Sequence, residues 1–220
     1  MPGDEPHRAV IFADLAGYTA LTDVHGDFSA ADIAQRFFDL TEGVLAGDAR
    51  IVKTIGDAVM VVASDPRQAL QIGLDLLHAV HREPYFPGLR VGVHYGPVVE
   101  RNEDLFGSTV NVAARLTAHA RVGQLLTTSV IASLLTELGH LTTVSLGPTV
   151  LKNVAEAVDV CWVADHTIGA TSQVLDPICR MFVDADSAPA RLPWNDRIWH
   201  FCSFDCARTF AEDPARHVLD

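Results

Sequence analysis

The feature that most limits the possible folds of this chain is a pair of apolar runs, Ala49 to Ile55 and Ala58 to Ala63. Only Gly56 and Asp57 separate them. A Gly-Asp pair between two short apolar runs predicts a β-hairpin, because glycine accepts the backbone angles that a tight turn requires. The elements on either side of this hairpin then set the fold class.

Strand and helix signals alternate around the hairpin. A strand is expected at Arg8 to Ala13, a helix from Asp27 to Gly47, a second helix opened by Asp65 and Pro66, and a strand at Leu89 to His94. This β-α-β-β-α-β order is the ferredoxin-like arrangement. Further elements are expected as helices at Ser108 to Arg121 and Val130 to Leu138, and as strands at Gln124 to Thr127, Leu141 to Leu146 and Ala157 to Val163. We therefore predict an α+β fold, a ferredoxin-like core with extra strands and helices.

The composition favours a globular, acidic protein. Hydrophobic residues make up 49% of the 220 residues, enough to bury a core. The 16 lysines and arginines are outnumbered by 28 aspartates and glutamates, giving a net charge of −12. This sign disfavours binding to nucleic acid and to anionic membranes. A phosphate-rich ligand would instead require divalent cations between carboxylate and phosphate, so paired aspartates are of interest.

The sequence suggests a cytoplasmic protein. No apolar run approaches the roughly 18 residues of a membrane span, and Met1 to Pro6 lacks the start of a signal peptide. Of the four cysteines, Cys161 comes first and is expected to be a core residue. Cys179, Cys202 and Cys206 cluster near the C-terminus, which in a reducing compartment favours metal or redox chemistry over disulfides.

We divide the chain into three parts. Residues 1–165 form the first domain, His166 to Val174 is a small, polar linker, and residues 175–220 form a second unit. The second unit is too short for a large core, so we expect it to be separate and stapled by metal.

Two carboxylates of the first domain stand at turn positions. Asp14 follows the first strand and Asp57 is at the tip of the hairpin, so both are expected at one end of the sheet, where they could hold two divalent cations. The segment Leu15, Ala16, Gly17, Tyr18 and Thr19 offers small residues and free amides to phosphate oxygens. The alternative is that Asp14 only caps a turn and Asp57 is an ordinary hairpin residue.

Three stretches in order, Phe12 to Thr19, Lys53 to Asp57 and Asp104 to Leu116, resemble the class III nucleotidyl cyclase catalytic domain. The resemblance covers Pro6 to Asp165. It implies an adenylate cyclase that binds ATP and two Mg²⁺ or Mn²⁺ ions per active site, in a homodimer whose two active sites are each shared between the subunits. The implied roles are metal ligands for Asp14 and Asp57, base selection for Lys53 and Asp104, and transition-state contacts for Asn111 and Arg115.

The chemistry of these residue types agrees with the implied roles. Lys53 is only a donor and matches adenine N1, whereas ionised Asp104 is only an acceptor and matches the 6-amino group. Guanine has the opposite polarity at both atoms, so ATP is expected over GTP. Arg115 can donate a bidentate hydrogen bond from its guanidinium to the α-phosphate. Asn111, one helical turn earlier, can orient the ribose. Lys152 resembles a phosphate-contacting lysine of the family, although a solvated loop lysine is the alternative.

The C-terminal stretches Asp176 to Asp184, Trp199 to Cys206 and Phe210 to Pro214 resemble the YHS domain, which is related to TRASH-type metal modules. The resemblance spans Leu175 to Leu219 and implies that Cys179, Cys202 and Cys206 bind Zn²⁺ or Cu⁺. Three thiolates are one ligand short of a closed tetrahedral site, so His200, His217 or an exogenous group would be the fourth. The YHS family usually has glycine where Arg180 stands. The alternative is that the cysteines only pack a small core.

Two other functions stay open at this point. One is a nucleotide-binding regulatory protein that has kept the fold without turnover. The other is a metal-binding protein that dimerises through the cyclase-like domain. The complete set of six residues favours the enzyme.

Overall fold

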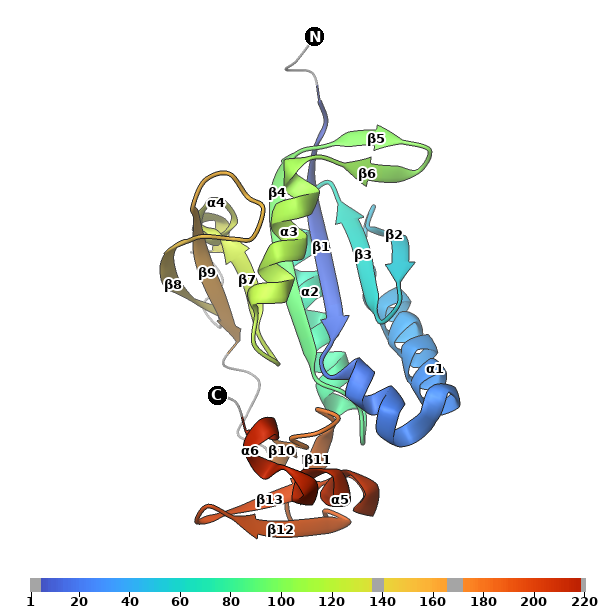
Figure 1. The fold of residues 1–220 in the computed structure, drawn as a ribbon. Helices are drawn as coiled ribbons and strands as arrows, with labels where there is room; N and C mark the ends of the chain where they lie inside the picture. The colour runs from blue at the N-terminus through green and yellow to red at the C-terminus, as the bar shows by residue number, and fades with distance from the viewer. Residues whose placement is uncertain (1–4, 136–140, 166–171, 219–220) are drawn as a thin grey trace.

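The computed structural model describes residues 5–135, 141–165 and 172–218 (Figure 1). Its first part is built around a seven-stranded sheet in the order β2-β3-β1-β4-β7-β9-β8. The β4 and β7 strands are parallel and the other neighbours are antiparallel, so the sheet is mixed. The strands are β1 (His7–Leu15), β2 (Arg50–Ile55), β3 (Ala58–Ala63), β4 (Leu89–Pro97), β7 (Leu125–Thr128), β8 (Leu141–Thr149) and β9 (Val158–Asp165).

Helices cover the two faces of this sheet unequally. Figure 1 shows α3 in front of the sheet and α2 behind it. The helices are α1 (Tyr18–Val44), α2 (Pro66–Arg82), α3 (Ser108–His119) and the short α4 (Ser129–Ala132), which a 3₁₀ turn (Ser133–Leu135) follows. A small hairpin of β5 (Val99–Arg101) and β6 (Asp104–Phe106) precedes α3. The predicted α+β class and the β-α-β-β-α-β core order are confirmed.

The central strand β1 shows how alternation separates the faces. Ile11 and Leu15 belong to the large apolar cluster that includes residues of α1 and α2. Val10 and Phe12 belong to a second cluster with α3 and the β5-β6 hairpin. Because successive side chains of a strand point to opposite faces, Asp14 lies on the same face as Val10 and Phe12. This is the face away from α1 and α2.

The first helix begins earlier than the sequence predicts. It starts at Tyr18 rather than Asp27, and it is interrupted at Gly26, whose angles are φ 83° and ψ 162°. Only glycine adopts such angles readily, so the start signal at Asp27 marks the second segment of a kinked helix. The Tyr18 hydroxyl donates to the Ala30 carbonyl at 3.0 Å and joins the two segments.

Other boundaries also differ. The β5-β6 hairpin was not predicted, and the helix expected at Val130 to Leu138 is a four-residue helix followed by the 3₁₀ turn, with 136–138 outside the described residues. Of the expected linker, 166–171 lie outside the described residues. Gln173 and Val174 pair in a strand, so the prediction of an aperiodic linker is wrong there.

The C-terminal module contains two small hairpins and two helices. Its elements are β10 (Gln173–Leu175), β11 (Phe182–Asp184), β12 (Ala190–Trp194), β13 (Arg197–Phe201), α5 (Phe204–Glu212) and α6 (Pro214–His217). Its apolar cluster, with Phe201 and Phe210, also contains Leu21 and Ala30 of α1. The module therefore packs against the first part of the chain, and the proposed domain boundary remains a prediction.

In the described parts of the chain, no helix combines the length and apolar character needed to cross a membrane.

Candidate functional site

Asp14 and Asp57 lie together at one end of the sheet. Asp14 is opposite Ala58 in the β1-β3 pair, and the Leu15 amide donates to the backbone carbonyl of Asp57 at 3.3 Å. Burial raises the pKa of both carboxyl groups, and the charge of Asp14 raises that of Asp57 further. Two half-buried carboxylates that repel each other make a donor set that fits divalent cations.

Arg90, on β4, is a site residue that the sequence analysis missed. It is opposite Asp14 in the β1-β4 register and its guanidinium pairs with the Asp14 carboxylate, which counteracts the raised pKa. Among the described residues, its Nε atom is buried without a hydrogen-bond partner. One arginine in the otherwise apolar run Leu89 to Val93 was the available signal.

Fewer backbone amides than predicted are free to bind phosphate in the segment from Leu15 to Thr19. The amides of Leu15 and Ala16 are not free, because they donate to the carbonyls of Asp57 and Gly88 at 3.3 and 2.8 Å. Gly17, with φ 73°, then precedes the first turn of α1, which begins with Tyr18 and Thr19. The first amides of a helix have no intrahelical acceptor. Phosphate-binding amides are therefore expected only from Gly17 onward.

Lys53 and Asp104 are in direct contact. Lys53 Nζ lies 2.7 and 2.6 Å from the two carboxylate oxygens of Asp104. The hydrogen bond from Lys53 lowers the pKa of Asp104, and the Leu105 amide donates to the same carboxylate at 2.8 Å. The strand β2 and the hairpin strand β6 thus bring together two residues that are 51 positions apart.

The two pairs share a sheet face but remain separate within one chain. Lys53 is opposite Met60, and Met60 is opposite Phe12, two residues before Asp14. At about 3.3 Å per residue and 4.8 Å per strand, Lys53 is offset from Asp14 by about 7 Å along the strands and about 10 Å across them. The two pairs are therefore distinct groups on one face of the sheet.

Asn111 and Arg115 lie on α3, and Lys152 follows β8. Asn111 is exposed and Arg115 is half-buried. Their spacing of four residues places them on one helix face. Lys152 is exposed, and its neighbour Leu151 packs in a cluster with Val112 of α3.

The three C-terminal cysteines converge. The Sγ atom of Cys202 is 3.4 Å from that of Cys179 and 3.6 Å from that of Cys206. Hydrogen bonds from Cys179 and Cys202 lower the pKa of the Cys206 thiol. Hydrogen bonding to Cys202 and Cys206, together with burial, raises the pKa of Cys179. Cys161, by contrast, is buried in the sheet, as expected for a core residue.

A histidine that the sequence analysis did not consider completes this cluster. His25 Nε2, from α1, is 3.4 Å from Cys202 Sγ and 3.6 Å from Cys206 Sγ. The ligand atoms of His25 and the three cysteines all lie within 4.8 Å of one another. Within the described residues this group contains neither His200 nor His217, the two histidines considered for the fourth ligand. No local spacing could reveal a partner 177 residues away.

Asp176 holds the cysteine loops in place. Its side chain is 0% exposed and accepts hydrogen bonds from the amides of Ile178 and Cys202, both at 2.8 Å. Burial raises its pKa to about 6. Arg180 follows with φ 61°, so the position where a glycine was expected does adopt the left-handed conformation.

A known family matches the first part of the chain. The family described as "Adenylate and Guanylate cyclase catalytic domain" matches residues 4–163. An adenylate cyclase of Glutamicibacter nicotianae is 41% identical over 129 residues, which is 58% of this chain and 32% of that protein. A pH-sensitive adenylate cyclase of Mycobacterium tuberculosis is 44% identical over 117 residues, 53% of this chain and 30% of that protein. The chain thus spans about a third of the length of these relatives.

Solved structures show the same fold. An adenylate cyclase of Trypanosoma brucei in its monomeric state superposes with a TM-score of 0.65 at 24% identity, covering 74% of this chain and 92% of that one. The adenylyl cyclase CyaB of P. aeruginosa gives 0.63 at 19% identity, covering 74% and 97%. With the family match over 4–163, this chain belongs to the adenylate and guanylate cyclase catalytic domain family.

Proposed function

We propose that the protein is an adenylate cyclase, which converts ATP to 3′,5′-cyclic AMP and pyrophosphate. The observation that carries this proposal is the Lys53–Asp104 contact on the sheet face that also carries Asp14. Relatives at 41% and 44% identity are named adenylate cyclases. The intact set of carboxylates, base-selecting pair and α3 residues argues against a nucleotide-binding protein without turnover.

Asp14 and Asp57 are the residues that would hold two Mg²⁺ or Mn²⁺ ions. Such ions supply charge neutralisation of the triphosphate and acidify the attacking hydroxyl. With Asp14 engaged in this way, Arg90 becomes available to a phosphate oxygen, because its present partner is the Asp14 carboxylate. The amides from Gly17 onward provide further donors at the start of α1.

The reaction requires positioning more than covalent help. The ribose 3′-oxygen forms a bond to the α-phosphorus, the bond from that phosphorus to the bridging oxygen of pyrophosphate breaks, and the hydroxyl proton is released. Arg115 donates to the α-phosphate as charge moves toward the leaving group. Asn111 orients the ribose for in-line attack. Lys152 contacts the triphosphate.

Base selection comes from the Lys53–Asp104 pair. When ATP binds, Lys53 donates to adenine N1 and Asp104 accepts from the 6-amino group. The two side chains already face each other. When adenine binds, the direct contact between Lys53 and Asp104 is replaced by one hydrogen bond between each side chain and the base.

We further propose a homodimer with two shared sites. The Asp14–Asp57 half-site and the Lys53–Asp104 half-site are separate in one chain, and a second copy against the same sheet face would join each to its complement. Subunit mixing tests this. Asp14→Ala and Arg115→Ala homodimers should each be nearly inactive, whereas a random mixture should regain roughly a quarter of wild-type activity. No recovery after confirmed exchange would mean that each site lies within one subunit.

The C-terminal module is proposed to bind Zn²⁺ or Cu⁺ through Cys179, Cys202 and Cys206. Their sulfurs are within 3.6 Å of a neighbour and Cys179 and Cys206 are buried, which suits soft thiolate coordination. We place the protein in the cytoplasm, where ATP is available and thiols stay reduced.

The decisive experiment is incubation of the purified protein with ATP and Mg²⁺ or Mn²⁺, followed by separation of the products. We expect cyclic AMP and pyrophosphate in equal amounts, and neither from the Asp57→Ala variant. ATP binding without either product would instead identify a nucleotide-binding regulatory protein.

A further inference from the structure

We propose that Cys179, Cys202, Cys206 and His25 form one tetrahedral zinc site, and that this site fastens the C-terminal module to the helix that starts at the phosphate-binding segment. The inference rests on the proposed metal binding by the three cysteines. It adds the fourth ligand, the metal and a link between the two parts of the chain.

The distances between the ligand atoms fit a tetrahedron around zinc. With Zn–S of about 2.3 Å and Zn–N of about 2.0 Å, tetrahedral S···S edges are about 3.8 Å and S···N edges about 3.5 Å. The S···S distances at Cys202 are 3.4 and 3.6 Å. The distances from His25 Nε2 to the sulfurs of Cys202 and Cys206 are 3.4 and 3.6 Å. One ion can therefore contact all four atoms with small side-chain adjustments.

The donor set selects zinc. Three thiolates and one imidazole make a closed four-ligand set of the kind that structural zinc sites use, and no open position is left for a substrate. Cys179 and Cys206 are buried and His25 and Cys202 are half-buried, so the site is only partly open to solvent. A trigonal Cu⁺ site of three thiolates would leave His25 without a function.

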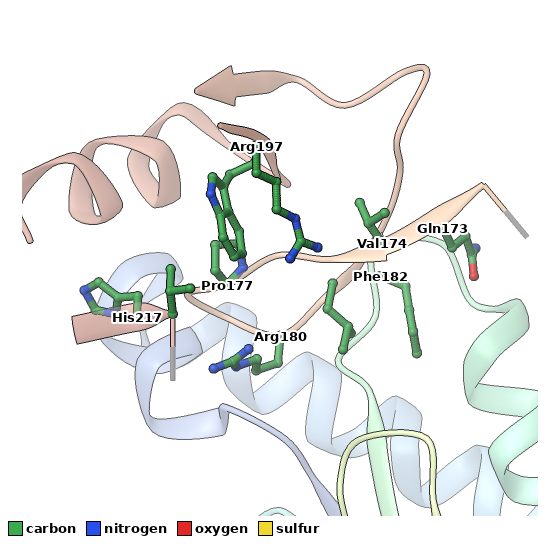
Figure 2. A pocket seen from close by; sticks show the side chains of 10 residues that line it. Gln173, Val174, Pro177, Arg180, Phe182, Arg197 and His217 are labelled. Carbon is green, nitrogen blue, oxygen red and sulfur yellow. The ribbon is translucent and has the colours of Figure 1, made fainter. Parts of the chain in front are cut away.

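The two other histidines considered for this role face elsewhere. His217 lines a cavity of about 460 Å³ in the C-terminal module, together with Arg180 and Arg197 (Figure 2). His200 is on β13, opposite Arg191. Neither shares the group of close ligand atoms that contains His25. They are therefore matched controls for a His25 variant.

His25 connects the site to the nucleotide-binding end of the sheet. It precedes the Gly26 kink, in the first segment of α1, which begins one residue after Gly17. Arg180, the residue after Cys179, packs directly against Gly17. A Cβ atom added to Gly17 would be 2.7 Å from Arg180 Cγ and 3.1 Å from the Cys179 carbonyl oxygen. A ligand change at the metal therefore acts on the segment that follows Asp14.

A second route runs through the backbone. The Gly88 amide donates to the Arg180 carbonyl at 2.9 Å, and the Gly88 carbonyl accepts from the Ala16 amide at 2.8 Å. Arg90, the partner of Asp14, is two residues further along. Zinc that orders the Cys179–Arg180 loop thus also orders the ends of the two strands that carry Asp14 and Arg90. By linkage, zinc and nucleotide must then change each other's affinity by the same factor.

The test measures zinc and does not require turnover. Full-length protein, stripped of metal and reconstituted, should bind one zinc per chain, and Co²⁺ in its place should give a tetrahedral spectrum with thiolate charge-transfer bands. His25→Asn should raise the zinc dissociation constant at least about 100-fold, whereas His217→Asn should leave it unchanged. His25→Cys guards against simple misfolding, because a four-thiolate site should retain zinc and strengthen the charge-transfer bands.

The possible results distinguish the assignment of His25 from the proposed metal binding by the three cysteines. Zinc affinity of His25→Asn equal to that of wild type would overturn the assignment of His25 while leaving the three-cysteine proposal intact. No metal bound by wild type would overturn both. For the link, the affinity for a non-cyclisable ATP analogue should change about five-fold or more on zinc loading of wild type, and not in His25→Asn. Equal affinities with and without zinc in wild type would overturn the link.

Discussion

The two parts of the chain are stabilised in different ways. The cyclase core surrounds a seven-stranded sheet with apolar clusters on both faces, and the chemistry-bearing side chains stand at the ends and on one face of that sheet. The C-terminal module has only two-stranded sheets and short helices, and its cluster includes residues of α1. We therefore expect the core to hold its site without metal at the cysteines, and the module to need α1 and the proposed ion to hold its own shape.

The largest expected effect separates turnover from folding. Asp57→Ala should lower cyclase activity at least about 1000-fold, because one carboxylate cannot hold the two cations that neutralise the triphosphate. The residue is in a turn at the end of the sheet, so the melting temperature should stay near that of wild type. Product assay and thermal unfolding, with zinc content as the control for the module, give the answer. Appreciable cyclisation by this variant would refute the assignment of the core site.

The next effect concerns the base-selecting pair. Lys53→Glu replaces the donor expected at adenine N1 by an acceptor and sets the new carboxylate against that of Asp104. We expect kcat/KM for ATP to fall about 100-fold or more and the preference over GTP to shrink. The matched control is Arg50→Glu, which makes the same charge reversal at an exposed position on the same strand. Equal kcat/KM for ATP and GTP in wild type would show that the pair does not read the base.

A third prediction compares the two apolar clusters directly. Phe37 is buried in the core, and Phe210 is buried in the module, where its ring is 5.2 Å from Phe201 and 5.5 Å from Trp199. Each Phe→Ala change should cost about 3–5 kcal/mol locally. Phe37→Ala should therefore lower the main thermal transition by about 10 °C. Phe210→Ala should instead loosen the module alone.

Two measurements distinguish these results. Circular dichroism follows the main transition, and limited proteolysis followed by mass spectrometry locates cleavage beyond residue 172. If Phe210→Ala lowers the main transition as much as Phe37→Ala does, the module and the core unfold as one unit and are not stabilised separately.

The sequence was most informative where structure is local. The hairpin at Gly56–Asp57 and the helical periodicity after Asp65 depend on neighbours along the chain, and both elements form as predicted. The kink at Gly26 was missed because the start signal at Asp27 comes directly after Gly26, where the second helical segment begins. The earlier segment starts at Tyr18 without a side-chain cap, so the sequence has no comparable start signal for it.

The site residues divide in the same way. Asp57 could be found from its turn position, and the Lys53–Asp104 pair from the family resemblance. Asp14 was found as the polar residue after an apolar run, but its expected turn position was wrong, because β1 continues to Leu15 and Asp14 is paired with Ala58 and Arg90. Arg90 and His25 could not be found, because each acquires its importance from a partner that is distant in sequence: Asp14 across a strand pair, and Cys202 across the contact between the two parts. A single sequence contains no spacing that encodes such contacts.

The smallest expected effect is the pH dependence of core stability. His94, on β4, is half-buried beside Thr128, with its Nδ1 atom 3.1 Å from the threonine hydroxyl oxygen, and desolvation of the imidazole lowers its pKa to about 4. The unfolded chain binds the proton near pH 6.5, whereas the folded chain does not until about pH 4. Between these values the unfolded state binds more protons, so the free energy of unfolding decreases as the pH falls.

His94→Asn should remove this slope. The pKa of His94 is about 2.5 lower in the folded chain than in the unfolded chain. Between pH 7 and pH 4 the free energy of unfolding of wild type should therefore fall by on the order of 3 kcal/mol more than that of the variant. Urea unfolding of the metal-loaded proteins at several pH values measures it, and His119→Asn, at an exposed position of α3, is the control. Parallel pH profiles for wild type and His94→Asn would mean that His94 takes up its proton in the folded core as readily as in the unfolded chain. Any decrease in the free energy of unfolding at low pH would then have to come from titrating groups of the C-terminal module rather than of the sheet.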